Sequence, residues 1–520
     1  MSRYLLKIKK YIILSVVYEI ILTASISLMM YMPGYLIDNY NKGLKFVLEL
    51  SLIYLVTFTI YLLFAYIANR NSDKRRYVFE LSIKNDFFKS LMNKNYQEFS
   101  QYHTDEYISM QTNDITELCT NYLSPLMAIY NNIIMIFIFG IVIIIFVDFS
   151  ISVVIISLSA FMVFVPKLTE KKLAYNNNEW LKRVAGYAII VRKFLESFMI
   201  LDIFSKKNLI KKNREELKKV MDANMEYRKV NSLAMVINGG AVEAISVVSF
   251  IMIAYLLIIN RITVGMATVG FMYCNKFIDP MYRLNQCIGQ VKSTKLIQKK
   301  LLSFIEDNHR NTELKNYNIE LINMNINIIS AKKVFDHIAI NYPKFELKFP
   351  KKYLIEGDNG AGKSVLLKAI MKFIELDDGS ITYGYRGINE DNIVNFISYI
   401  PQNQIIYSAS YEDNVSIFGT YNLEKLSDYE KLFPKSIIEK IKRNNNLSTL
   451  SGGEAQVIGL LRALCSEKKV LIMDEPFSAM NKQVIKEFLK NVYNMEKLMV
   501  VIAHNVEEKI FFDEIFLYRE

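Results

Sequence analysis

Long apolar runs dominate the first half of the chain, whereas the second half alternates short apolar segments with polar ones. Six runs approach or exceed the roughly 20 residues that a helix needs to cross a bilayer, at residues 11–32, 46–68, 126–146, 151–165, 233–259 and 264–278. The fourth and sixth are the shortest, and the sixth carries Asn275 and Lys276. Six successive runs predict six membrane spans better than six buried helices of one soluble core.

The segments between these runs also predict helices. Residues 69–122 and 167–231 carry apolar side chains at helical spacing within a charged background. A helical extension of about 25 residues would carry a span nearly 40 Å beyond the membrane, at about 1.5 Å per residue. Residues 283–307 form a basic helical connector, and residues 308–327 are a polar, Asn-rich link.

From about residue 328, strand-like and helix-like segments alternate, which predicts an α/β domain with a largely parallel sheet. A glycine-rich loop lies between the apolar run 353–355 and the helix-like run 365–370. It reads Gly357, Asp358, Asn359, Gly360, Ala361, Gly362, Lys363 and Ser364. This is the Gly-x-x-x-x-Gly-Lys-Ser pattern of a phosphate loop in its usual strand–loop–helix setting.

Glycines let the backbone N–H groups of this loop face phosphates, and the helix that follows adds the positive end of its dipole. We expect Lys363 to reach the β- and γ-phosphates of ATP. We expect Ser364 to offer Mg²⁺ a hydroxyl, because Mg²⁺ prefers hard oxygen ligands.

Four further motifs lie downstream of this loop. The apolar segment 469–473 is typical of a strand buried in a parallel sheet, and it ends in Asp474 and Glu475. Asp474 would hold Mg²⁺ through water, and Glu475 would polarise the attacking water. A helix start that can bind an anion comprises Ser451, Gly452, Gly453 and Glu454. Gln402 and His504 each follow a strand-like run.

Taken in chain order, these five motifs resemble those of the ATP-binding cassette (ABC) transporters, specifically the exporter-type half-transporters. The resemblance covers essentially the whole chain. It implies a multidomain fold, with an all-α six-helix transmembrane domain at 1–307, a linker at 308–327 and an α/β P-loop ATPase domain at 328–520.

The resemblance also implies roles for single residues. Gln402, Glu475 and His504 would be catalytic, and Ser364, Gln402 and Asp474 would contact Mg²⁺. Nucleotide would lie on Gly357 to Ser364, the adjacent Val365, and Ser451, Gly452, Gly453 and Glu454. Phe335 is the choice for stacking on adenine, because Tyr342 lies closer to the loop than the family spacing suggests.

Two positions depart from the family pattern. Val365 stands where a Thr often follows Lys-Ser, so we expect a modestly weaker nucleotide affinity. Asn481 ends the D-loop where an Asp is usual, which weakens the case for communication between two paired sites. None of the primary catalytic positions is lost.

The basic residues that give the chain its net charge of +11 are concentrated in a few segments. Basic residues gather at the start of the chain and after the second and fourth spans, so the positive-inside rule predicts that both termini and both long loops are cytoplasmic. Nucleic acid is therefore not an expected partner.

The first apolar run is too long for a signal peptide and lacks a small-residue cleavage site. Four cysteines without ligand-like spacing predict neither a disulfide framework nor a zinc site.

Three functions remain open at this point. The first is ATP-driven export of a peptide, a lipid or an amphipathic small molecule across the plasma membrane. The second is an ATP-gated channel or sensor, although Glu475 and His504 favour turnover. The third is an importer, disfavoured because membrane and ATPase parts share one chain without a substrate-capturing domain. We see no peptidase-like segment before the first span, so we do not expect this chain to cleave a leader from its cargo.

The family arrangement implies a dimer, in which the signature of one cassette completes the phosphate loop of another. A homodimer is favoured over a heterodimer. Glu19 and Glu243 lie within the first and fifth spans, where an ionisable group is costly unless it faces a partner or water. We expect both to face the bundle interior, as part of an acidic site for cationic cargo or in a structural pair with a group such as Lys276.

Overall fold

The computed structural model describes residues 1–146, 149, 153, 157, 165, 167–306, 320–335, 338–358, 360–386, 388–389, 392–503 and 509–518. Its contacts divide the chain into two units. The first comprises Met1–Ser90 and Thr104–His309, and the second comprises Leu91–His103 and Arg310–Glu520.

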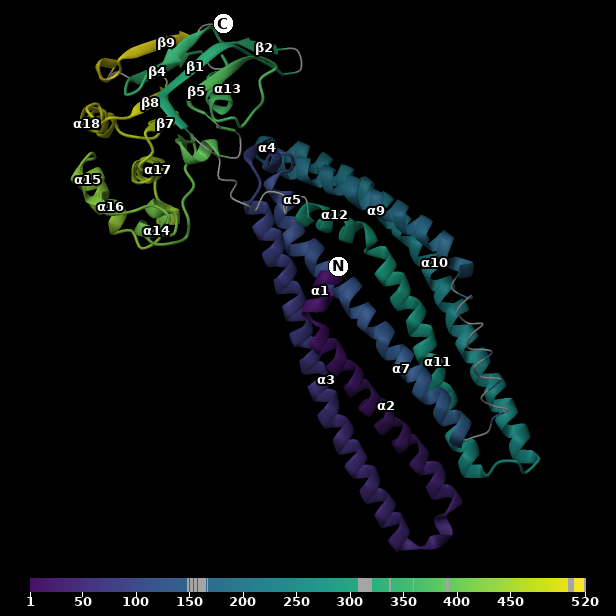
Figure 1. Cartoon of the computed structure of the whole chain (residues 1–520). Coiled ribbons are helices and arrows are strands. Elements are labelled where there is room, and N and C mark those ends of the chain that lie inside the picture. The colour runs from purple at the N-terminus through teal and green to yellow at the C-terminus, as the bar shows by residue number, and fades with distance from the viewer. Residues whose placement is uncertain are drawn as a thin grey trace. The chain divides into compact units, whose positions relative to one another are not determined.

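The first unit is helical (Figure 1). Its helices are α1 (Ser2–Lys7), α2 (Lys9–Asp38), α3 (Leu44–Met92), α5 (Thr104–Ser109), α6 (Ile115–Leu118), α7 (Ser124–Phe146), α9 (Lys167–Glu196), α10 (Ile203–Ile258), α11 (Val264–Ser293) and α12 (Lys295–Glu306). The helix α7 packs on both α2 and α11, and α10 packs on α9 and α11. The predicted helical extensions are confirmed, since α3 and α10 each join an apolar segment to a charged one without a break.

Within the described part of the chain, four helical stretches are long and apolar enough to cross a membrane. They are Lys9–Asp38, Leu44–Met92, Thr104–Ile145 and Ile203–Ile258. The expected span 151–165 lies almost wholly outside the described residues. The expected span 264–278 is helical, as the first half of α11, and its crossing of the membrane stays a prediction. Only 6% of the apolar window of α3 is buried, which suits a helix that faces lipid.

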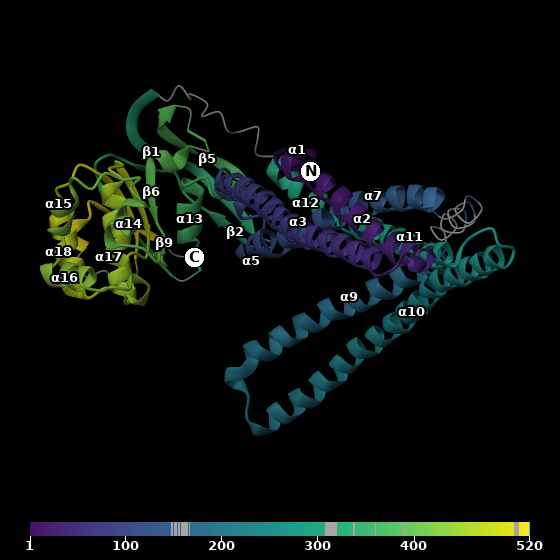
Figure 2. The same ribbon diagram turned by 90° about the horizontal axis from the view of Figure 1, so that it is seen from below.

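The charged segments of α9 and α10 lie side by side as an antiparallel pair (Figure 2). Trp180 stacks on Tyr227 with ring centroids 5.6 Å apart, and the Tyr187 hydroxyl donates a hydrogen bond to Asn213 at 2.8 Å. One aromatic contact and one hydrogen bond therefore link the two helices.

The second unit is an α/β domain, as the sequence predicts. Its helices are α4 (Tyr96–Phe99), α13 (Lys363–Ile370), α14 (Tyr411–Ser416), α15 (Leu426–Glu430), α16 (Lys435–Lys442), α17 (Gly452–Cys465) and α18 (Lys482–Val492). Its strands are β1 (Glu320–Phe335), β2 (Ile338–Asn341), β3 (Phe345–Leu347), β4 (Lys352–Gly357), β5 (Asp378–Arg386), β6 (Ile397–Ile400), β7 (Val470–Asp474), β8 (Leu498–Ile502) and β9 (Glu514–Tyr518).

Five strands form a parallel sheet in the order β6-β7-β8-β4-β9, and four form an antiparallel sheet around β1. The parallel strands are buried on both faces because each face has its own core. In β7, Leu471 and Met473 enter one apolar cluster with α17 and α18, whereas Val470 and Ile472 enter another with α13. This explains why β7 is a continuous apolar run rather than an alternating one.

Strand β1 begins at Glu320, inside the segment that the sequence assigned to a linker. The reason is visible in the residues, because Ile322, Met324, Ile326 and Ile328 alternate with asparagines. This alternation has the period of two that a half-buried strand requires. Ile326 and Ile328 are buried, so the asparagines belong to an ordered strand and not to a polar link.

Two glycines let α2 and α11 cross closely. A Cβ added at Gly34 would lie 2.5 Å from the carbonyl oxygen of Gly265, and one at Gly265 would meet the carbonyl oxygen of Gly34. Next to the crossing, Asp38 accepts a hydrogen bond from the backbone N–H of Gly265 at 2.8 Å and another from Thr263, the N-cap of α11. Backbone contact and helix capping therefore occur at the same place.

We predict that Gly265→Ala lowers the stability of the protein by about 1–3 kcal/mol, because the methyl group must displace backbone atoms. Gly240→Ala is the matched control, since its Cβ would meet nothing within 4 Å and alanine favours the helix. Thermal unfolding of the purified full-length protein in detergent measures both. Equal unfolding midpoints for the two variants would contradict this account of the crossing.

Candidate functional site

The phosphate loop joins the end of β4 to the start of α13. Gly360 and Gly362 have φ angles of +90° and +85°, in the left-handed region that favours glycine. A Cβ on Gly362 would also lie 2.6 Å from Ile340. Lys363 is 6% exposed, and its ammonium donates to the carbonyl oxygens of Gly357 and Asp358 at 2.6 and 2.7 Å. The loop thus curls around its own lysine, as it would around a phosphate. Asn359 lies outside the described residues.

Tyr342, the alternative to Phe335 as a partner for adenine, lies buried against the phosphate loop. Its ring is 2% exposed, and its hydroxyl donates a hydrogen bond to the carbonyl oxygen of Gly362 at 2.8 Å. Tyr342 therefore supports the phosphate loop through this hydrogen bond. Phe335 is 43% exposed at the end of β1, so its ring is accessible to a base. Its role in stacking stays a prediction.

Asp474 ends β7 beside the first turn of α13. The Ser364 hydroxyl donates to its Oδ1 at 2.9 Å, and the Tyr399 hydroxyl lies 3.4 Å from its Oδ2. Burial raises the pKa of the Asp474 carboxyl, and the hydrogen bond from Ser364 opposes that shift. Burial and the adjacent Asp474 raise the pKa of the Tyr399 hydroxyl, so it stays protonated at neutral pH and can donate a hydrogen bond.

These residues suit Mg²⁺. Ser364 and Asp474 bring two oxygen ligands together, and the 7% exposed Asp474 carboxylate lacks an ion pair in the described part of the chain. The described residues contain no cluster of three or more His, Cys, Asp or Glu side chains that could hold a metal. A site with one protein carboxylate and one hydroxyl is typical of Mg²⁺ held jointly with nucleotide phosphates.

Glu475 and Gln402, placed by separate strands, meet in space. The Gln402 amide donates a hydrogen bond to Glu475 Oε2 at 2.7 Å. Glu475 has a φ of +49°, an uncommon angle for a residue other than glycine. Its backbone N–H donates to the carbonyl oxygen of Ile502 at 2.9 Å, which fixes the turn that aims the side chain. His504 lies outside the described residues.

The signature segment, Leu450 to Glu454, leads into the start of the helix α17, as the sequence predicts, and α17 also contacts the D-loop, Ser478 to Asn481. Ser451 and Glu454 form a capping box at the start of α17. Gln456, a residue outside the motifs of the sequence, donates to Ser478 at 2.9 Å and accepts from the backbone N–H of Ala479 at 3.1 Å. A Cβ on Gly453 would lie 2.5 Å from the carbonyl oxygen of Ala479, so glycine is needed for this contact.

The two departures from the family pattern have local explanations. Asn481 is the N-cap of α18, and its side chain accepts from the backbone N–H of Gln483 at 2.9 Å. Asparagine caps a helix about as well as aspartate, so the D-loop keeps its boundary. Val365 is half-buried and packs on the apolar cluster under the parallel sheet.

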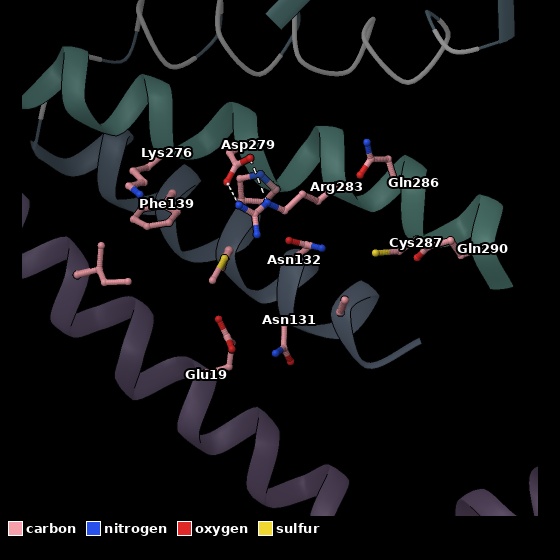
Figure 3. Close-up of a pocket in the computed structure, with 14 residues that line it drawn as sticks. Glu19, Asn131, Asn132, Phe139, Lys276, Asp279, Arg283, Gln286, Cys287 and Gln290 are labelled. Atoms are coloured by element: carbon pink, nitrogen blue, oxygen red, sulfur yellow. Dashed lines mark hydrogen bonds and ion pairs between the residues drawn. The ribbon is translucent and has the colours of Figure 1, made fainter. Parts of the chain in front are cut away.

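A second candidate site is a cavity of about 540 Å³ between α2, α7 and α11 (Figure 3). Its lining combines apolar and polar side chains, namely Glu19, Ile26, Ala128, Asn131, Asn132, Met135, Phe139, Lys276, Asp279, Pro280, Arg283, Gln286, Cys287 and Gln290. Asp279 and Arg283 form an ion pair at 3.0 Å along α11. Glu19 is 7% exposed, and its Oε1 has no hydrogen-bond partner among the described residues. In Figure 3 its carboxylate points toward the cavity.

This cavity differs from the expected acidic site in two ways. Lys276 and Arg283 contribute positive charge, so the lining is mixed rather than acidic. Glu243 is exposed on α10 and does not line the cavity. The fifth apolar run could not reveal which face of α10 its single acid occupies. The adjacent Asn131 and Asn132, inside an apolar span, were the signal that could have located the cavity.

Family models match two parts of the chain. The ABC transporter transmembrane region matches residues 12–281, and the ABC transporter ATP-binding model matches residues 340–478. The chain belongs to the ABC transporters. A helical membrane region fused ahead of an ABC ATPase domain is the organisation of an exporter half-transporter, so the predicted fold class is confirmed.

Individual relatives are distant. The chain is 28% identical over 269 residues to the lactococcin-A transport/processing ATP-binding protein LcnC of Lactococcus lactis, a match that covers 49% of the chain and 37% of that relative. A putative export ATP-binding/permease protein of Rickettsia typhi is 24% identical, over 95% of the chain and 88% of its own length. The solved structure of a bacterial Atm1-family ABC exporter with ATP bound has the same fold, with a TM-score of 0.76 at 14% identity over 99% and 94% of the two chains.

We predict that Glu475→Gln preserves ATP binding and lowers ATP hydrolysis by about 10²–10³-fold, because the amide keeps the shape but loses the charge that polarises water. The new amide oxygen can still accept the hydrogen bond from Gln402. Phosphate release and binding of a fluorescent ATP analogue measure the two effects. Glu467→Gln is the control, since that exposed carboxylate pairs with Lys425 in the same unit. Lys363→Ala should instead lose binding. Undiminished turnover by Glu475→Gln would refute the assignment.

Proposed function

We propose that this chain forms a homodimeric exporter that uses ATP and Mg²⁺ to move amphipathic, peptide-like cargo across the plasma membrane, with both termini in the cytoplasm. One observation carries the proposal. The phosphate loop, Asp474 and the Gln402–Glu475 pair are assembled for hydrolysis, in a chain whose membrane helices also line a cavity with a mixed polar and apolar surface.

Turnover explains the site better than gating does. A channel needs ATP only to bind, which Lys363 and the phosphate loop supply. Glu475, tied to Gln402 and held in an uncommon backbone conformation, is needed only if water must be positioned for hydrolysis. An importer is disfavoured, because relatives that match most of the chain are described as export proteins.

The cavity supports a cargo with both apolar and hydrogen-bonding groups. Phe139 and Met135 offer apolar contacts, whereas Asn131 and Asn132 offer amides. Several relatives are described as transport proteins for bacteriocin peptides, which favours peptides within this class. The chain spans less than half the length of those relatives, so their cargo is a guide only to the chemical class.

The number of nucleotide-binding motifs in the chain supports a dimer. The chain has one phosphate loop and one signature, and in exporters of this family the signature of one subunit completes the phosphate loop of the other. Ser451 caps α17 within its own chain, which still leaves the N-terminal end of that helix able to attract an anion. Two copies of this chain would supply two complete sites.

Export is tested in inside-out membrane vesicles. We expect a fluorescent basic amphipathic peptide to accumulate in the vesicles when ATP and Mg²⁺ are present, and Glu475→Gln to abolish the accumulation. A non-hydrolysable ATP analogue should not replace ATP, because transport requires turnover. Peptide flux with the analogue, or with Glu475→Gln, would favour a gated channel instead.

Cargo charge is tested on ATP hydrolysis. The unpartnered Oε1 of Glu19 can accept hydrogen bonds from a cationic group, and such a contact is strong in a cavity of low dielectric constant. We predict that a cationic amphipathic peptide stimulates hydrolysis and that Glu19→Gln lowers its apparent affinity about fivefold. Glu243→Gln is the matched control, an exposed acid outside the cavity. Equal effects of the two substitutions, or equal stimulation by an anionic peptide, would contradict this role of Glu19.

A further inference from the structure

The helix α13 carries the phosphate loop at its start and holds α4 at its end. Lys372, just after α13, has a φ of +52°, and the backbone N–H of Phe373 bonds back to the carbonyl oxygen of Lys368 at 2.8 Å. This turn points the carbonyl group of Lys372 and the ring of Phe373 toward α4. The Gln97 amide donates to that carbonyl oxygen at 3.0 Å, and Tyr96 stacks on Phe373 with ring centroids 4.2 Å apart.

Phe373 also contacts a residue next to Asp474, one of the two expected Mg²⁺ ligands. Phe373 meets the ring of Tyr399 edge to face, with centroids 5.5 Å apart at 87°. The Tyr399 hydroxyl lies 3.4 Å from Asp474 Oδ2, while Ser364 donates to Oδ1 at 2.9 Å. A continuous series of contacts therefore runs from α4 through two aromatic rings to the carboxylate.

Two hydroxyl groups from different elements restrain Asp474. With Ser364 alone, the carboxylate could still turn about its terminal torsion, which is broad and roughly two-fold. The contact from Tyr399 to Oδ2 favours one of these orientations. Its length of 3.4 Å exceeds the usual O–H···O range of about 2.5–3.0 Å, so it is a weak contact that a closer approach of the Tyr399 ring would strengthen.

We propose that Tyr399 is a positioning residue, which orients the Asp474 carboxylate for Mg²⁺ through its hydroxyl and makes that orientation depend on the seating of α4 through its ring. In the sequence, α4 lies between α3 and α5, so the segment whose position affects Asp474 belongs to the loop that follows the second expected span. No part of this role requires Tyr399 to touch nucleotide.

The hydroxyl is tested by Tyr399→Phe, which keeps the ring on Phe373. Binding of a fluorescent ATP analogue to the full-length protein in lipid nanodiscs is measured with EDTA and across a Mg²⁺ titration. We expect unchanged affinity in EDTA and an approximately fivefold rise in the Mg²⁺ concentration that gives half of the Mg²⁺ effect. Tyr411→Phe is the control, because its buried hydroxyl donates to Glu430 at 2.9 Å, away from the site. The same Mg²⁺ midpoint in wild type and Tyr399→Phe would overturn the proposal.

The dependence on α4 is tested by Tyr96→Ala, with Tyr77→Ala as an exposed aromatic control. We expect Tyr96→Ala to raise the Mg²⁺ midpoint in the wild-type background and to have little effect in Tyr399→Phe. Fully additive effects would overturn the coupling to α4. Absence of any Mg²⁺ effect in wild type would instead reject the magnesium site of the proposed function. The readout is nucleotide binding, so failure of export does not affect it.

Discussion

The chemistry of this protein depends on the parallel register of three strands. In β8, Ile502 is level with Ile355 of β4 on one side and with Asp474 of β7 on the other. The carboxyl ends of these strands therefore meet at one edge of the sheet, as parallel pairing requires. The phosphate loop follows β4 at the same edge where Asp474 closes β7, and Ser364 is within hydrogen-bond distance of it. A slip of one residue would turn Asp474 to the other face of the sheet.

The same register brings in Gln402. Strand β6 pairs with β7 so that Ile400 lies opposite Met473, and Gln402 and Glu475 each come two residues later in the chain. Their hydrogen bond of 2.7 Å follows from this alignment. The apolar clusters on the two faces of the sheet fix the register, because neighbouring residues of β7 are buried on opposite sides. Apolar burial thus sets the positions of polar groups that contribute little to the core themselves.

The membrane unit meets a different constraint. Its spans cannot gain stability by hiding apolar side chains from lipid, so close contacts and polar pairs matter more. The crossing of Gly34 and Gly265 and the caps supplied by Asp38 and Thr263 are contacts of this kind. Asp279 and Arg283 neutralise each other on one helix, whereas the Oε1 atom of Glu19 has no hydrogen-bond partner among the described residues. A buried carboxylate oxygen without a hydrogen bond is costly in such a setting, and that cost makes Glu19 a candidate for contact with cargo.

The sequence by itself determined the two-part architecture, the apolar spans of α2, α3, α7 and α10, and the phosphate loop with Asp474 and Glu475. Each of these is a local signal, carried by side-chain periodicity or by contiguous residue types. Contacts between distant segments were decided only by the tertiary structure. Tyr342 could be a base-stacking or a buried ring by its spacing, and packing places it under Gly362. The exposure of Glu243, the seat of α4 on Phe373 and the approach of Tyr399 to Asp474 likewise depend on which faces of separate elements meet. Sequence periodicity specifies which residues share a face, but packing between elements selects the neighbour of that face.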